Sequence, residues 1–262
     1  MSAFQAVRRI PFPAKKVSGT TARQALAILE NAYPAAVTAL NYANPFELLI
    51  AVILSAQNTD TRVNLTTPAL FKAYPTADKL ARADSGTVEA MIKSCGFFRT
   101  KTKSIIGASQ AIVTNHSGEV PKTREELEAL PGVGRKSASV VLSVAFADAA
   151  FAVDTHVFRV AHRLGLTLGK TPREVEADVT AIVPREKWRH AHHWLILHGR
   201  QICKAPVPQC GRCPVAALCS TPKIILKTKA ERFIAATGLR RLNGPASPTP
   251  RPARSISKVK KR

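Results

Sequence analysis

Acidic residues are scarce in this sequence, which has 17 Asp and Glu against 39 Lys and Arg among 262 residues and a formal net charge of +22. The excess lies at the two ends: residues 1–20 have four basic and no acidic side chains, and residues 221–262 have twelve and one. Residues 21–220, with 23 basic and 16 acidic side chains, are moderately basic. This balance favours an anionic polymer as partner, since each neutralised phosphate releases counterions; a tail that serves only solubility is the alternative.

Long apolar runs are also missing. No stretch of about 20 apolar residues occurs, which argues against a transmembrane helix. The most apolar segment, SASVVLSVAFADAAFAV, is short and interrupted by Asp148, so we expect a buried helix followed by a turn. The N-terminus lacks the apolar core of a secretory signal, and we expect residues 1–20 to be a disordered basic extension rather than a transit peptide.

Strand patterns are few, and apolar residues recur with helical spacing through most of the chain. Asn44 followed by Pro45 predicts a helix start, as does Asp154, whose helix is expected to end at Gly165. Another helix is predicted from about Arg135 to Phe146. After residue 243 the composition turns to Pro, Ser, Lys and Arg, which is typical of disorder. The predicted fold class is therefore all-α.

Only five cysteines are present, and four of them lie in the segment CKAPVPQCGRCPVAALC with the spacing C-x6-C-x2-C-x5-C. Two disulfides are the alternative to metal binding, but the chain has no secreted character. Spacing alone separates zinc poorly from a [4Fe–4S] cluster, although the wide x6 and x5 loops suit the larger group. The candidate metal ligands are Cys203, Cys210, Cys213 and Cys219.

The segment LPGVGRK predicts a tight turn between two helices. Gly132 and Gly134 can adopt positive φ, and their backbone N–H groups with the next helix N-terminus form an anion site that fits a DNA phosphate. Such a contact positions a duplex without reading its sequence. An ordinary helix–helix turn is the alternative.

Lys136 stands in the first turn of the helix that follows, where the helix dipole disfavours a cation. An amine nucleophile must be neutral, and partial burial would add to this effect. A plain phosphate contact is the alternative for Lys136. Asp154 is the second candidate, because a carboxylate fixed as a helix cap can also do chemistry; capping alone is its alternative role.

Taken together, LPGVGRK, the VDTH motif that follows the lysine, the four cysteines and PFELLIAVILSAQNTD resemble the bacterial endonuclease III family, over roughly residues 21–220. The resemblance implies the two-domain helix–hairpin–helix DNA glycosylase fold with a small C-terminal iron–sulfur loop. Its domains would be residues 38–148, a six-helix domain with the hairpin, and residues 21–37 plus 149–220, which hold a [4Fe–4S] cluster. Residues 221–262 would be a basic, largely disordered tail.

The resemblance also implies a reaction. Lys136 would attack C1′ of a damaged nucleotide, form a Schiff base and cleave the strand by β-elimination, while Asp154 would stabilise positive charge on the sugar. This predicts a bifunctional glycosylase and abasic-site lyase that removes oxidised pyrimidines in base excision repair. A pyrimidine-dimer glycosylase, a mismatch adenine glycosylase, or a non-catalytic DNA-binding module with a structural zinc are the alternatives.

The expected partner is double-stranded DNA with damaged bases or abasic sites, bound by a monomer in the bacterial cytoplasm at the nucleoid, with no membrane contact. Gln57 and Phe97 match the family's wedge positions, which fill the gap left by a flipped-out base; core packing is the alternative for Phe97. Asn58 stands where the family often has a small residue. His190, His192 and His193 are expected on a helix surface. The full set of expected DNA contacts is Gln57, Phe97, Gly132, Val133, Gly134, His156, Lys204 and Arg212.

Overall fold

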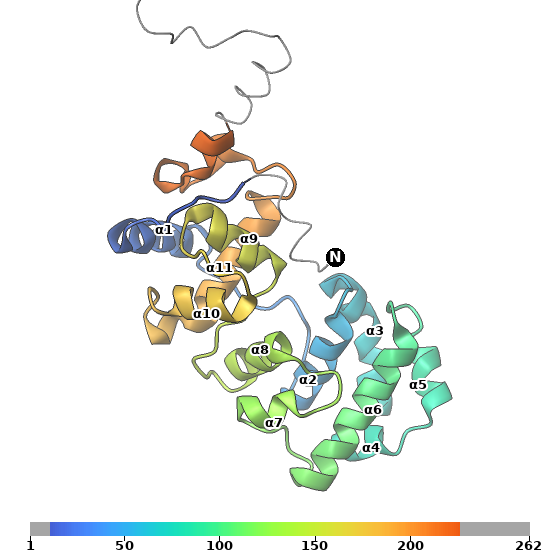
Figure 1. Ribbon diagram of the computed structural model, residues 1–262. Coiled ribbons are helices and arrows are strands. Elements are labelled where there is room, and N and C mark those ends of the chain that lie inside the picture. The colour runs from blue at the N-terminus through green and yellow to red at the C-terminus, as the bar shows by residue number, and fades with distance from the viewer. Residues whose placement is uncertain (1–10, 226–262) are drawn as a thin grey trace, which may run out of the picture. The chain divides into compact units, whose positions relative to one another are not determined.

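The computed structural model describes residues 11–225, and within them every regular element is a helix, which confirms the all-α prediction (Figure 1). No helix in this range is long and apolar enough to cross a membrane. The predicted tail beyond residue 225 lies outside the described residues. The α-helices are α1 (Gly19–Ala32), α2 (Pro45–Ser55), α3 (Asp60–Ala73), α4 (Ala77–Ala81), α5 (Ser85–Ile92), α6 (Phe98–Asn115), α7 (Arg124–Glu128), α8 (Arg135–Ala145), α9 (Thr155–Leu164), α10 (Pro172–Thr180) and α11 (Trp188–Gln201). The 3-10 helices are η1 (Arg185–Lys187), η2 (Cys210–Arg212) and η3 (Ala216–Leu218).

Polar caps fix where helices α2 and α9 begin. Asn44 accepts a hydrogen bond from the Glu47 N–H at 3.0 Å, with Pro45 in the first position of α2, as predicted. Asp154 caps α9, and Gly165 ends it with φ of 76°, again as predicted. These caps are local, so the sequence specifies them without help from the tertiary fold.

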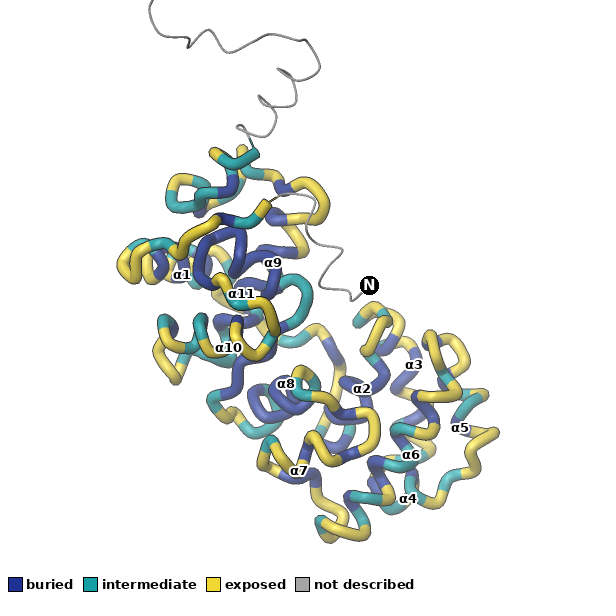
Figure 2. Tube along the Cα trace, viewed as in Figure 1, coloured by how far each residue is buried: buried dark blue, intermediate teal, exposed yellow. Residues whose placement is uncertain are grey.

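Two hydrophobic clusters form the core. One gathers buried side chains of α2 to α8, and the other those of α1, α9, α10 and α11. Figure 2 shows α9 buried along much of its length. The division into domains at residues 38–148, with residues 21–37 and 149–220 as the second domain, stays a prediction.

The segment between α8 and α9 joins the two clusters. Ala150 and Ala152 belong to the first cluster, while Phe151 and Val153 belong to the second. Alternate residues of an extended segment point in opposite directions, so four consecutive side chains serve both cores. Because this segment ends at Asp154, the carboxylate is fixed relative to the helix that carries Lys136.

The end of the expected N-terminal extension is part of the folded chain, contrary to the prediction of disorder for residues 1–20. The Phe12 ring stacks on His162 with centroids 4.6 Å apart, Lys16 pairs with Asp178 at 2.6 Å, and the Val17 N–H donates to Gly165 at 2.9 Å. The spacing of apolar residues did not indicate this segment, because it is held by separate contacts of single residues and not by a regular helix. The predicted start of the tail is also too early, since Thr221 is buried.

Candidate active site and cysteine-lined cavity

The hairpin between α7 and α8 depends on Gly132. Its φ is 79°, and a Cβ there would lie 2.6 Å from the Ser104 Cβ, so only glycine fits. Gly134 differs from the prediction: its φ is −99°, because it is the N-cap of α8 and needs an extended backbone. A Cβ on Gly134 would meet nothing within 4 Å, so its missing side chain leaves open space at the helix start.

Backbone N–H groups face this open space. Within residues 11–225 the N–H groups of Gly134, Arg135 and Lys136 have no acceptor, and the first turn of α8 holds no acidic residue. Such a helix start is an anion site. Val133 is a weaker candidate than expected, because its side chain is buried and its N–H already donates to Leu130.

Lys136 is exposed, so the expected partial burial is absent from the free protein. The residue before it is anchored: Arg135 donates to Glu176 of α10 at 2.9 Å. Arg124 of α7 donates to the same carboxylate at 3.3 Å and to Ser139 of α8 at 2.7 Å. Glu176 thereby ties the start of α8 to α10, and the backbone that carries Lys136 is held while its side chain stays free.

Asp154 uses one carboxylate oxygen as a cap. Its Oδ1 accepts the N–H groups of His156 and Val157, both at 2.8 Å. Its Oδ2 has no hydrogen-bond partner among the described residues, and the side chain is half-buried. One oxygen therefore fixes the orientation, and the other is available for chemistry.

Two neighbouring histidines on α11 interact electrostatically with the two candidate catalytic groups. The rings of His192 and His193 have centroids 3.9 Å apart. Burial holds the pKa of His192 well below its usual value, and electrostatic interactions with His193 and Lys136 lower it further. Burial also lowers the pKa of His193 to about 4, and Asp154 opposes that shift. Lys136 and Asp154 are thus both within electrostatic range of one ring pair.

The expected surface position of His192 is wrong, since its side chain is 0% exposed. The Phe151 ring, from the segment between α8 and α9, packs edge-on against His192 with centroids 6.1 Å apart. Its Nε2 is buried with no hydrogen-bond partner among the described residues.

The two wedge candidates share an unusual backbone. Gln57, after α2, and Phe97, the N-cap of α6, both have φ of 56°, in the left-handed region that non-glycine residues seldom adopt. Both side chains are exposed, Phe97 by 66%. A core-packing role for Phe97 is therefore wrong.

His156 is half-buried beside Arg159, whose guanidinium lies 3.1 Å from the His156 Nδ1. Arg159 also donates to the carbonyls of Gly199 and Cys203, each at 3.0 Å. Burial lowers the pKa of His156, with Asp154 opposing. Arg159 therefore connects the VDTH segment with the first of the four clustered cysteines.

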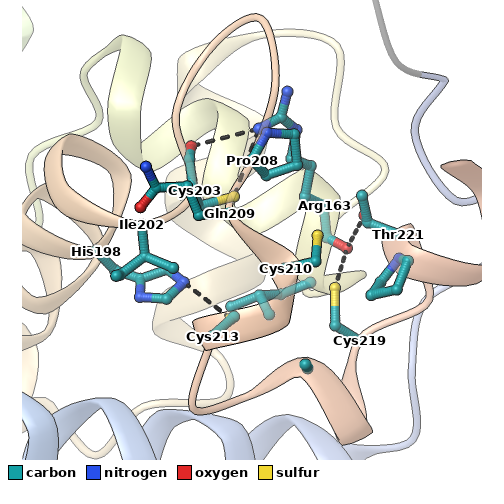
Figure 3. A pocket seen from close by; sticks show the side chains of 13 residues that line it. Arg163, His198, Ile202, Cys203, Pro208, Gln209, Cys210, Cys213, Cys219 and Thr221 are labelled. Carbon is teal, nitrogen blue, oxygen red and sulfur yellow. Dashed lines mark hydrogen bonds between the residues drawn. The ribbon is translucent and has the colours of Figure 1, made fainter.

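The four clustered cysteines line one small cavity, drawn in Figure 3. All five cysteines of the chain, each among the described residues, are free thiols, so the disulfide alternative is not adopted. No three Cys, His, Asp or Glu side chains within residues 11–225 come close enough to hold a single metal ion. The exposed side chains of Lys204 and Arg212 lie in the same loop region.

A buried arginine organises the wall of this cavity. Arg163, 1% exposed, donates to the carbonyls of Cys203, Lys204 and Pro206 at 3.3, 2.8 and 3.2 Å. It also reaches the Cys203 sulfur at 3.5 Å, and its own carbonyl accepts from Cys219 and Thr221 (Figure 3). The two ends of the cysteine loop are thus both hydrogen-bonded to one residue of α9.

The donor set fits a cationic iron–sulfur group. Burial raises the pKa of the Cys213 thiol to about 11 and raises those of Cys210 and Cys219. Thiols in such a setting ionise only when a positive charge compensates them. Arg163 Nε is buried without an acceptor among the described residues, so the cavity wall also has a donor to spare.

Several residues that hold the site in position were not identified from the sequence. Arg159 and Arg163 carry a readable signal: they lie four residues apart on a helix rich in apolar residues, where a buried charge needs a partner. Glu176 and Lys101 carry no such signal in the sequence, because their hydrogen-bond partners are far away along the chain.

Comparison with known proteins agrees with this geometry. Residues 50–185 match the family model of the HhH-GPD superfamily base excision DNA repair protein. Endonuclease III of Synechocystis sp. is 49% identical over 199 residues, spanning 76% of this chain and 91% of the relative. Endonuclease III of Escherichia coli K12 is 46% identical over 186 residues, spanning 71% and 88%. A solved structure of a trapped endonuclease III–DNA covalent intermediate has a TM-score of 0.77 at 43% identity, covering 80% of this chain and 99% of that chain.

Proposed function

Because the chain belongs to the endonuclease III family of base excision DNA repair proteins, we propose that Lys136 and Asp154 are its catalytic pair and that it removes oxidised pyrimidines. Its reaction class is that of the family: DNA N-glycosylase and abasic-site lyase. The observation that carries the residue assignment is the state of the two groups: the Lys136 side chain is exposed at an open helix start, and Asp154 keeps one carboxylate oxygen without a hydrogen bond among the described residues.

In the proposed reaction the Lys136 Nζ forms a bond to C1′ while the bond from C1′ to the damaged base breaks and the base leaves with a proton. The sugar ring then opens to give a Schiff base. Loss of a C2′ proton and departure of the 3′ phosphate complete β-elimination. The Asp154 Oδ2 stabilises the positive charge that develops on the sugar, while its Oδ1 remains occupied by the helix cap.

The open helix start of α8 is the proposed phosphate site. A DNA phosphate would accept from the free N–H groups after Gly132, which holds the duplex beside Lys136. Gln57 and Phe97 would enter the stack where the target base leaves it, and His156 would face the lesion. Lys204 and Arg212 would add phosphate contacts. Base removal from the stack costs a few kcal/mol, less for a damaged base.

We assign the four clustered cysteines to a [4Fe–4S] cluster. Cys203, Cys210, Cys213 and Cys219 would hold it in the cavity next to Arg163. When bound, the cluster supplies the positive charge that compensates the four thiolates and cross-links the loop. The chain's own contribution is to hold that loop, with its basic side chains, in one position.

Replacing Asp154 by asparagine is expected to separate capping from chemistry. Asparagine caps a helix as well as aspartate does, so the free energy of unfolding should stay within about 0.5 kcal/mol of wild type. The negative charge is lost, so single-turnover base release should fall by about 100-fold. Asp84→Asn, at the cap of α5, is the matched control and should leave the rate unchanged. A wild-type rate for D154N would restrict Asp154 to capping.

The substrate assignment is tested with duplexes that each carry one lesion: an oxidised pyrimidine, a pyrimidine dimer, adenine opposite an oxidised guanine, or an abasic site. Base release and strand cleavage are measured separately. We expect both with the oxidised pyrimidine and cleavage at the abasic site. Preferential action on the dimer or on mismatched adenine would replace the proposed substrate by one of the alternatives.

A further inference from the structure

The two exposed wedge residues sit on backbone that needs support. Gln57 and Phe97 each have a left-handed conformation, which is strained for a non-glycine residue and persists only where neighbouring groups hold it. They belong to different segments, one after α2 and one before α6. Some group must therefore hold each of them, and the hydrogen bonds show that one side chain serves both.

That side chain is Asn58. Its Nδ2 donates to the Leu54 carbonyl in the last turn of α2 at 2.7 Å. Its Oδ1 accepts the N–H of Gly96, the residue before Phe97, at 2.9 Å. One carboxamide thus bonds the segment of the first wedge residue to the segment of the second. The sequence offered two roles for Asn58, a contact near the lesion or exposure to solvent, and neither includes this bridge.

Lys101 reinforces the bridge from α6. Its Nζ, on a residue only 6% exposed, donates to the carbonyls of Leu54 and Ala56, both at 2.7 Å. Its own N–H donates to the Phe97 carbonyl at 3.0 Å. The carbonyl of Leu54 therefore accepts from both Asn58 and Lys101. The first turn of α6 and the last turn of α2 form one hydrogen-bonded unit that carries both wedge residues.

We propose that Asn58 is a positioning residue that locks the Gln57 and Phe97 segments into one rigid wedge, which keeps the duplex open once the target base has left the stack. This inference rests on the proposed function. A wedge fixed in advance loses little conformational freedom when it enters the duplex. When the lock is removed, each wedge side chain must be ordered separately, and the flipped-out state becomes less populated.

The role is tested with Asn58→Ala on two substrates. One carries the lesion opposite a normal base, and the other carries the same lesion in single-stranded DNA, where no duplex has to be opened. Single-turnover base release should fall about tenfold on the duplex, equivalent to about 1.4 kcal/mol and to one or two hydrogen bonds. On the single strand it should stay within about twofold, since no gap needs filling. The fluorescence of 2-aminopurine beside the lesion should report less unstacking in the variant.

Asn64→Ala is the matched control, because Asn64 also bridges two backbone groups, donating to Ala39 at 2.7 Å and accepting from Asn41 at 2.9 Å, away from the wedge. Its duplex-to-single-strand ratio should equal that of wild type. Asn58→Asp keeps the acceptor for Gly96 and loses the donor to Leu54. Its duplex-to-single-strand ratio of base release should therefore lie between those of wild type and N58A. The same variant serves as the test if N58A does not fold.

Each result decides a different statement. An N58A ratio equal to that of wild type, or an equal loss on both substrates, overturns the lock while the proposed function stands. Wild-type protein that neither releases a base nor forms a reducible adduct overturns the proposed function and the lock with it. A duplex-selective loss, absent from N64A, supports the lock.

Discussion

Replacing Lys136 by alanine is expected to abolish the adduct that borohydride traps between wild-type protein and lesion-bearing DNA, and to lower base release by at least about 10³-fold. The amine is the only group proposed to bond to C1′, so its loss removes the covalent route. Folding should not change, because Lys136 is exposed and has no ion pair or hydrogen bond through its side chain among the described residues. The neighbouring anchor, Arg135 with Glu176, stays in place.

The measurement is a reduced trapping assay followed by identification of the modified residue, alongside single-turnover base release. Lys79→Ala, an exposed helical lysine on α4, is the matched control and should trap like wild type. DNA binding by K136A should survive, since the hairpin N–H groups remain. A trapped adduct that persists in K136A, or that maps to another lysine, would refute the assignment. A wild-type protein that binds DNA without any adduct would favour the non-catalytic alternative.

The second large effect is expected from Arg163→Met. Methionine fills much of the same space but leaves the carbonyls of Lys204 and Pro206 without their donor, whereas the Cys203 carbonyl keeps its hydrogen bond from Arg159. Both acceptors are only part-buried, and an unpaired buried acceptor costs about 1–3 kcal/mol, so the free energy of unfolding should fall by about 2 kcal/mol. Because these carbonyls fix the cysteine loop, the iron content of the purified protein should fall as well.

Urea unfolding and iron analysis of the purified protein check this prediction. Arg185→Met provides the same chemical change at an exposed arginine, whose contact with Asp148 is 4.0 Å long, and should alter neither quantity. If R163M keeps wild-type stability and iron, then Arg163 does not organise the loop. If it loses stability but keeps its iron, the loop is stabilised by Arg163 without being needed for cluster binding.

Much of the helical framework could be read from the sequence, because its determinants are local. The caps Asn44 and Asp154 and the stop at Gly165 depend on residues within one turn. The hairpin was partly predictable. Gly132 has the expected positive φ. Gly134 has a negative φ instead, because it is the N-cap of α8 and needs an extended backbone.

Residue type and spacing alone determined the all-helical class, the helix caps, the hairpin turn and the group of four cysteines. Only the tertiary structure decided which side chains meet across the sequence: Glu176 with Arg135, Arg163 with the cysteine loop, and Asn58 with Gly96. It also decided that His192 is buried, against its expected surface position, and that Phe97 is exposed rather than packed in the core. The physical reason is that caps and turns are satisfied by neighbours along the chain, whereas burial and long-range hydrogen bonds depend on how helices pack against one another.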